Sequence, residues 1–163
     1  TGVFKDDASV VCECCEQATD AYYCGSVYCV ANVNYLCPYC IASGAAAGKF
    51  DAGFIQDADP LPPGAADAQG KTEELFKRTP GYFSWQGERW LVCCDDYCEF
   101  LGDVGTKELE DLGIAEEVFT EYALRGEFAV EDAQGYLVAG GDMAGYLFRC
   151  TRCGKYKIQV DTS

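Results

Sequence analysis

The spacing of its cysteines constrains this chain more than any other feature of the sequence. Twelve of the 163 residues are cysteine, and none is histidine. Two thiolates separated by two to four residues can bind one metal ion from the same turn of backbone. Pairs of this kind occur four times, as Cys12/Cys15, Cys37/Cys40, a pair within Cys93, Cys94 and Cys98, and Cys150/Cys153.

Two physical explanations compete for such a cysteine-rich chain. Disulfides form in oxidising compartments, whereas metal-binding thiolates persist in reducing ones. Because tetrahedral Zn²⁺ needs two pairs of thiolates, four pairs predict two zinc ions per chain, each bound by four cysteines. The absence of histidine makes both predicted sites all-thiolate. It also excludes Ser-His and Cys-His catalytic pairs and any imidazole pH switch.

The first predicted site combines Cys12 and Cys15 with Cys37 and Cys40, after 21 intervening residues. This interval is close to the C-x2-C-x15–20-C-x2-C spacing of zinc ribbons. Pro38 suits the first turn of a helix that would carry Cys40. The alternative is a thioredoxin-like redox motif, because Cys37-Pro-Tyr-Cys40 has its outward form. That motif should follow a strand in a βαβ unit, and it leaves the Cys12/Cys15 pair unexplained.

The second predicted site is centred on Cys150 and Cys153, which lie between two strand-like segments. Gly154 permits the positive φ that turns the chain and points backbone N–H groups at sulfur. Three basic residues surround the pair and favour thiolate over thiol. They are Arg149, Arg152 and Lys155. A pair of buried or redox-active cysteines in a hairpin is the alternative interpretation.

The other half of this site must come from the cluster of Cys93, Cys94 and Cys98. Geometry usually lets only one of two adjacent cysteines face a metal, and spacing leaves Cys93 and Cys94 nearly equal. Cys94 is favoured because three intervening residues close a tighter loop with Cys98. The second predicted ligand set is therefore Cys94, Cys98, Cys150 and Cys153. The remaining cysteines are expected to be buried small hydrophobic residues: Cys14, Cys24, Cys29 and the unused member of the Cys93/Cys94 pair.

The chain is strongly acidic, with 12 Lys and Arg residues against 27 Asp and Glu residues and a formal net charge of −15. Eight thiolates (−8) and two Zn²⁺ (+4) would add −4 and bring the total to about −19. Phosphate backbones need a positive field, so the charge disfavours a nucleic-acid partner and favours a basic protein. No stretch approaches the roughly 20 apolar residues of a membrane-spanning helix, and no membrane partner is expected.

The remaining sequence predicts an α+β fold of small zinc-ribbon or knuckle-like β elements and several short helices, organised by the two four-cysteine zinc sites. Helices are expected over residues 41–47, 72–78, 106–112, 114–124 and 130–139. Strands are expected over residues 84–92, 146–148 and 156–160, the last two as a closing hairpin. The expected organisation is one compact domain with an N-terminal zinc-binding module (1–56), an exposed Pro-, Gly-, Ala- and Asp-rich loop (57–71) and an α+β region with the second zinc site (72–163).

Several motifs stand in a fixed order along the chain and suggest a family. They include Cys12-x-x-Cys15-Glu16-Gln17-Ala18, Leu36-Cys37-Pro38-x-Cys40-Ile41-Ala42-Ser43-Gly44, Arg78-Thr79-Pro80-Gly81-Tyr82, Cys94-x-Asp96-Tyr97-Cys98 and Phe148-Arg149-Cys150-x-x-Cys153-Gly154. Together they resemble the bacterial CbrC family, whose named member is linked to tolerance of nuclease colicins. The resemblance covers nearly the whole chain, favours Cys94 over Cys93 as the ligand and implies no catalytic mechanism. Members of that family usually begin with a further short segment, so Thr1 is expected to lie inside the natural protein.

These features lead us to expect a cytoplasmic, non-enzymatic zinc protein whose acidic surface binds a basic protein. The nuclease domain of a colicin is such a partner, because it must be basic to hold DNA and an acidic protein is steered onto it quickly. A thiol-redox or metal-handling enzyme that uses Cys37/Cys40 or the spare cysteines remains an alternative. A nucleic-acid-binding zinc-ribbon regulator is another, and its local basic strip would be Arg149, Arg152, Lys155 and Lys157.

Overall fold

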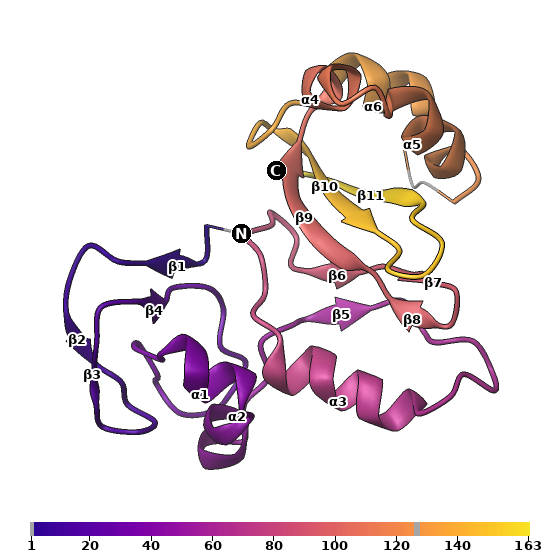
Figure 1. Ribbon diagram of the computed structural model, residues 1–163. Helices are drawn as coiled ribbons and strands as arrows, with labels where there is room; N and C mark the ends of the chain where they lie inside the picture. The colour runs from indigo at the N-terminus through magenta and orange to yellow at the C-terminus, as the bar shows by residue number, and fades with distance from the viewer. Residues whose placement is uncertain (1, 126–127) are drawn as a thin grey trace. The chain divides into compact units, whose positions relative to one another are not determined.

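The computed structural model describes residues 2–125 and 128–163 and confirms the α+β class, with short strands and short helices (Figure 1). Its backbone divides into two compact units. The first comprises the described residues up to Ala58 together with Pro62–Phe83 and Gly87–Arg89, and the second comprises Asp59–Leu61, Ser84–Gln86 and Trp90–Ser163. These boundaries differ from the expected division at residues 57–71, because the helix that follows this loop belongs to the first unit.

The first unit contains very short strands and three helices. The strands form antiparallel pairs of two residues each, β1 (Phe4–Lys5) with β4 (Tyr22–Tyr23) and β2 (Val10–Val11) with β3 (Ala18–Thr19). Its remaining elements are α1 (Pro38–Ala42), α2 (Ala45–Phe50), β5 (Asp57–Ala58) and α3 (Ala68–Arg78). Strand pairs of this length are marginal in water, so side-chain packing and the cysteines must hold this unit together.

Two helix boundaries differ from those expected, and each difference has a local cause. The helix expected over 41–47 is interrupted between α1 and α2, because Gly44 adopts a left-handed conformation with φ 77°. Helix α3 begins at Ala68 rather than at residue 72. Asp67 caps it, since its carboxylate accepts a hydrogen bond of 3.3 Å from the backbone N–H of Gly70.

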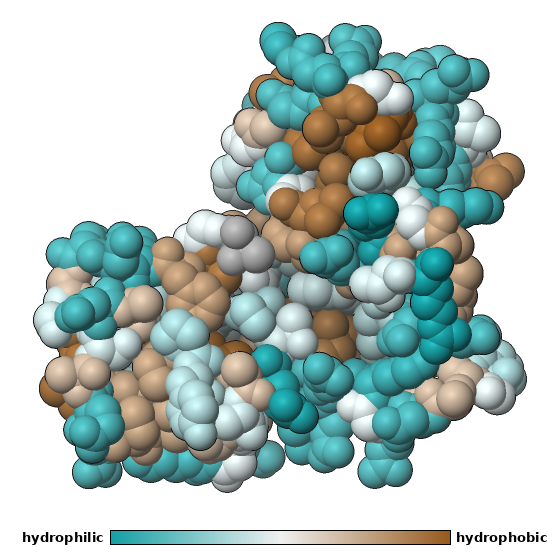
Figure 2. Space-filling view, in the orientation of Figure 1, coloured by the Kyte–Doolittle hydropathy of each residue, from teal (hydrophilic) through white to brown (hydrophobic). Residues whose placement is uncertain are grey.

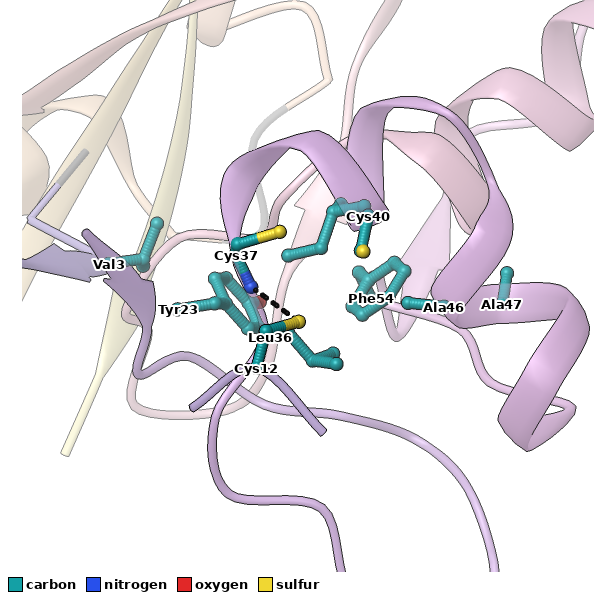
Figure 3. Packing of buried hydrophobic residues seen from close by; sticks show 10 residues of the cluster. Val3, Cys12, Tyr23, Leu36, Cys37, Cys40, Ala46, Ala47 and Phe54 are labelled. Carbon is teal, nitrogen blue, oxygen red and sulfur yellow. Dashed lines mark hydrogen bonds between the residues drawn. The ribbon is translucent and has the colours of Figure 1, made fainter. Parts of the chain in front are cut away.

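The core of the first unit surrounds three cysteines. Tyr23 and Phe54 are buried and meet edge to face, with ring centroids 5.7 Å apart. Figure 3 shows the sulfur atoms of Cys12, Cys37 and Cys40 among these aromatic and aliphatic side chains. The cysteine cluster is therefore part of the hydrophobic core rather than an attachment to its surface.

The second unit is built on a three-stranded antiparallel sheet with the order β11-β10-β9. The expected closing hairpin is confirmed as β10 (Met143–Arg149) and β11 (Tyr156–Thr162), with Leu147 opposite Ile158. The third strand, β9 (Glu99–Val104), was not expected from the sequence. Two further short strands, β7 (Val92–Cys93) and β8 (Asp96–Tyr97), form a tight hairpin, and β6 covers Arg89–Trp90.

Three helices accompany this sheet, in the order α4 (Thr106–Asp111), α5 (Ala115–Tyr122) and α6 (Val130–Tyr136). Their buried side chains, such as Leu109, Val118 and Phe119, form one core with Leu147 and Ile158 of the sheet. Helix α6 ends three residues earlier than expected, because the chain becomes extended at Leu137. In the part of the chain that the structure describes, none of the helices combines the length and apolar character needed to cross a bilayer.

A charged group fastens α5 to the edge strand β11. The carboxylate of Glu121 lies 2.8 Å from Nε of Arg125 and 3.0 Å from Nζ of Lys157, and all three side chains are at most one quarter exposed. Burial disfavours the ionised carboxylate, but the hydrogen bonds and charges of Arg125 and Lys157 outweigh it and lower the pKa of Glu121.

Replacing Glu121 by Gln is expected to lower the free energy of unfolding by about 1 kcal/mol at pH 7. Because the folded-state pKa lies below the unfolded value of about 4.3, the stabilisation is complete above that pH and is lost as the pH falls through the folded-state pKa. Urea unfolding of parent and variant between pH 7 and pH 3 measures this difference. The matched change Glu110→Gln, at an exposed acid of α4, should alter stability by less than about 0.5 kcal/mol at every pH.

Candidate metal centres

The first centre gathers the four cysteines that spacing predicted for it. The Sγ atoms of Cys12, Cys15, Cys37 and Cys40 all lie within 4.8 Å of one another. Cys15 is exposed, whereas the other three are buried in the core of the first unit. A soft cation at their centre would have sulfur on every side and little access to water.

The separations between sulfur atoms fit a metal ion and not a disulfide. The Sγ atoms of Cys15 and Cys37 are 4.0 Å apart, and those of Cys93 and Cys153 are 3.7 Å apart. Four sulfurs at a Zn–S distance of about 2.3 Å are about 3.8 Å apart in a regular tetrahedron, whereas a disulfide requires about 2.05 Å. All twelve cysteines are unpaired thiols.

A turn at Cys12 and Cys15, which we call the first hook, directs its sulfurs inward. The backbone N–H of Cys12 donates to Gln17 O at 2.9 Å, and that of Glu16 donates to Cys12 O at 2.8 Å. Glu16 has a left-handed φ of 61°. The Sγ of Cys12 then accepts a 3.3 Å hydrogen bond from the backbone N–H of Cys37, as the dashed line in Figure 3 shows.

The second centre gathers Cys93, Cys94, Cys150 and Cys153, again with all Sγ atoms within 4.8 Å. Cys150 and Cys153 form the second hook, between β10 and β11. The backbone N–H of Cys150 donates to Lys155 O at 2.9 Å, and that of Gly154 donates to Cys150 O at 3.0 Å. These two bonds match those of the first hook one for one. Gly154, with φ 75°, occupies the position that Glu16 has in the first hook.

Cys98 lies outside the second centre, so the structure corrects the expected ligand set. Its side chain is only 3% exposed, its N–H donates to Leu91 O at 2.9 Å, and its carbonyl accepts a 2.7 Å bond from Nε1 of Trp90. These contacts hold Cys98 in the core of the second unit. The fourth member of the second centre is Cys93, and not Cys98 as the spacing had predicted.

Cys93 joins the second centre because of a turn at Cys94, which was not predicted from the sequence. Cys93 pairs with Asp96, so Cys94 and Asp95 form a two-residue hairpin loop, with φ values of 50° and 62°. Adjacent side chains point apart in an extended strand, but this turn brings both sulfurs to the same side, 3.8 Å apart. The signal was weak, because such loops favour Asn-Gly or Asp-Gly rather than Cys-Asp.

Within each hook, backbone N–H groups lower the pKa of the first cysteine. Burial opposes ionisation of Cys12 and of Cys150, but backbone N–H groups pointing at each sulfur lower the pKa to about 6 in both. Burial and the neighbouring sulfurs instead raise the pKa of Cys40 and of Cys93. A bound cation would oppose these two upward shifts, because it favours the ionised form of each thiol that binds it.

The other three unassigned cysteines are less buried than expected. Cys14, Cys24 and Cys29 are each half-buried. Cys14 packs against the core of the first unit, and the thiol of Cys29 lies 3.1 Å from Ala31 O. All three lie outside both four-cysteine groups.

Comparison with known proteins identifies the family. The family model described as "Uncharacterised protein family (UPF0167)" matches residues 1–162. The chain belongs to the UPF0167 family. A UPF0167 protein of Pseudomonas aeruginosa is 39% identical over 159 residues, which cover 94% of this chain and 87% of the relative. UPF0167 proteins of Mycobacterium bovis and Mycobacterium tuberculosis are each 37% identical over 161 residues, which cover 93% of this chain and 82% of either relative.

The resemblance to the CbrC family is therefore wrong, because both the matching family model and these relatives carry the UPF0167 name. No solved structure matches the chain. The cysteine geometry, and not a family name, must support any functional inference.

The corrected ligand set can be tested by metal content. Cys93→Ala should reduce the metal bound per chain from two ions to one, because three thiolates bind a metal ion far more weakly than four. Cys98→Ala removes the same atoms from a cysteine nearby and should leave two. Elemental analysis of both purified variants decides the question, and a loss of one metal ion in Cys98→Ala but not in Cys93→Ala would restore the set expected from spacing.

The equivalence of the hooks predicts opposite effects of two substitutions. Gly154→Ala places a side chain at φ 75° and should lower stability by about 1–2 kcal/mol. Glu16→Gly removes a side chain from φ 61° and should raise stability by about 0.5–1 kcal/mol. Thermal unfolding of the zinc-loaded variants measures both. A destabilising Glu16→Gly change would show that the hooks differ in conformation.

Proposed function

We propose that this protein is a zinc protein whose two four-cysteine centres are structural and whose acidic surface binds a basic protein. The observation that carries the proposal is the recurrence of one hook geometry in two separate groups of four sulfurs. The metal is inferred from the ligands, because tetrahedral sites of four thiolates favour zinc, or iron as the alternative. Elemental analysis separates these two metals.

Four protein ligands support a structural rather than a catalytic role. A catalytic zinc keeps one coordination position open for water or substrate, whereas a closed site of four cysteines leaves none. Each centre also joins segments that are far apart in sequence. The first joins residues 12–15 to 37–40, and the second joins residues 93–94 to 150–153. A non-enzymatic protein is the simplest interpretation of two such centres.

The charge supports a basic partner. The formal charge of −15 becomes about −19 when two zinc ions are bound by eight thiolates. Figure 2 shows many hydrophilic residues on the visible face, as such a charge requires. A strongly negative field steers positively charged proteins into contact and repels nucleic acids. We place the protein in the cytoplasm, because reducing conditions keep thiolates available for metal.

The nuclease domain of a colicin remains one candidate partner of this class. Its support is now the charge argument alone, because the family name that pointed to colicin tolerance is contradicted. Any protein with a strongly basic face satisfies the same argument, so the experiment uses the nuclease domain as a representative basic protein.

Zinc-loaded protein should bind a purified colicin nuclease domain and lose at least about tenfold in affinity between 50 and 300 mM NaCl, because the attraction is electrostatic. Titration calorimetry at the two salt concentrations measures the change. An acidic protein of similar size is the control and should show no heat of binding. Absence of binding by protein that carries two zinc ions contradicts the partner proposal and leaves the metal proposal intact.

A further inference from the structure

The two hooks share a backbone conformation but differ in what covers them. In the first hook, the two residues between the cysteines are Glu13 and Cys14, and in the second hook they are Thr151 and Arg152. The carbonyl groups of these residues can accept hydrogen bonds from other segments. Contacts to them determine how easily a hook can move away from its metal.

Contacts from two other segments, helix α2 and residues 34–35, hold the first hook in place. The Nζ of Lys49, from α2, donates to the carbonyls of both Glu13 and Cys14 at 2.9 Å. The N–H of Glu13 donates to Tyr35 O at 2.9 Å, and the carboxylate of Glu13 accepts from the N–H of Asn34 at 3.2 Å. Three of the four ligands also lie in the core. Releasing this metal would require opening the first unit.

The second hook is open to solvent. Within residues 2–125 and 128–163, no side chain donates a hydrogen bond to the carbonyl of Thr151 or Arg152. Arg152 of this hook forms an ion pair of 3.8 Å with Asp96, and the side chain of Arg152 is half-exposed. Cys94 and Cys153 are exposed and Cys93 is half-buried, whereas Cys150 is buried, so solvent reaches the second centre from the side of its two exposed ligands.

We propose that the second centre exchanges its zinc with an external thiolate ligand, whereas the first retains its zinc. The proposal rests on the proposed function, because it requires zinc in both centres. Both centres keep the structural role proposed above, and the second is in addition a site from which metal passes to, or arrives from, a thiol-bearing acceptor.

The exchange needs only ligand substitution. Cys93, Cys94, Cys150 and Cys153 are the residues that would hold the zinc. An incoming thiol would replace the exposed Cys153 thiolate as a ligand, and the proton of the incoming thiol would pass to Cys153. Charge and atoms balance, and no oxidant or reductant takes part.

The local basic residues favour such an acceptor. The protein as a whole repels an anionic thiolate, but Arg149 and Lys155 are exposed beside the second hook, and Gly154 lies between that lysine and Cys153. The positive charges of these two side chains offset part of that repulsion for an approaching thiolate. The acceptor expected from this chemistry is a peptide or protein with free cysteines at metal-binding spacing.

The experiment follows zinc transfer from zinc-loaded protein to an excess of a metal-free peptide with four cysteines, under reducing conditions. One zinc per chain should leave in a fast phase, and the other should leave at least about 100-fold more slowly. Cys93→Ala, which removes a ligand of the second centre, should abolish the fast phase. Lys49→Met, which unfastens the first hook, should accelerate the slow phase about tenfold and leave the fast phase unchanged.

A matched pair of lysine variants tests the local field. Lys155→Gln should slow the fast phase about threefold, whereas Lys107→Gln, at an exposed lysine of α4, should leave it unchanged. Transfer of both zinc ions at a single rate overturns the proposal, as does a fast phase that survives Cys93→Ala and disappears in Cys12→Ala. Purified protein without zinc contradicts the proposed function instead, before any transfer is measured.

Discussion

The rest of the structure depends on two groups of four sulfur atoms, each held within 4.8 Å of one another, an arrangement that suits a cation. Two unit charges about 4 Å apart repel by about 4 kcal/mol at an effective dielectric constant of 20, and four thiolates make six such pairs. A divalent ion at the centre converts this repulsion into attraction. The hooks prepare for it by stabilising one thiolate each, at Cys12 and Cys150, through backbone N–H groups.

This constraint explains why so little regular structure is sufficient. The strands of the first unit are only two residues long, and its aromatic core closes around the sulfurs instead of around a sheet. The second unit has a true three-stranded sheet, and there the centre joins a short hairpin to the end of β10. The same ligand chemistry therefore supports the core in one unit and fastens a peripheral hairpin in the other.

The sequence predicted the features that spacing encodes. The four cysteines of the first centre, the second hook and the closing hairpin all follow from short-range patterns. The place of Cys93 in the second centre was not predicted, because it depends on a two-residue turn at Cys94 and Asp95 that lacks the usual glycine. Strand β9 was not predicted either. Gly102 interrupts the sequence pattern expected of a strand, and the pairing of β9 with β10 is set by tertiary contacts. Backbone conformation at single residues, and long-range pairing, limit what spacing can show.

The separation of ligands along the chain has a consequence for synthesis on the ribosome. The first centre has all its ligands once Cys40 has emerged, whereas the second waits for Cys153, which is 113 residues later (153 − 40). At about 5–20 residues per second, the delay is roughly 6 to 23 s. In a newly made chain the ligands of the first group are therefore complete before those of the second, and Cys93 and Cys94 emerge before Cys150 and Cys153 are available to complete their group.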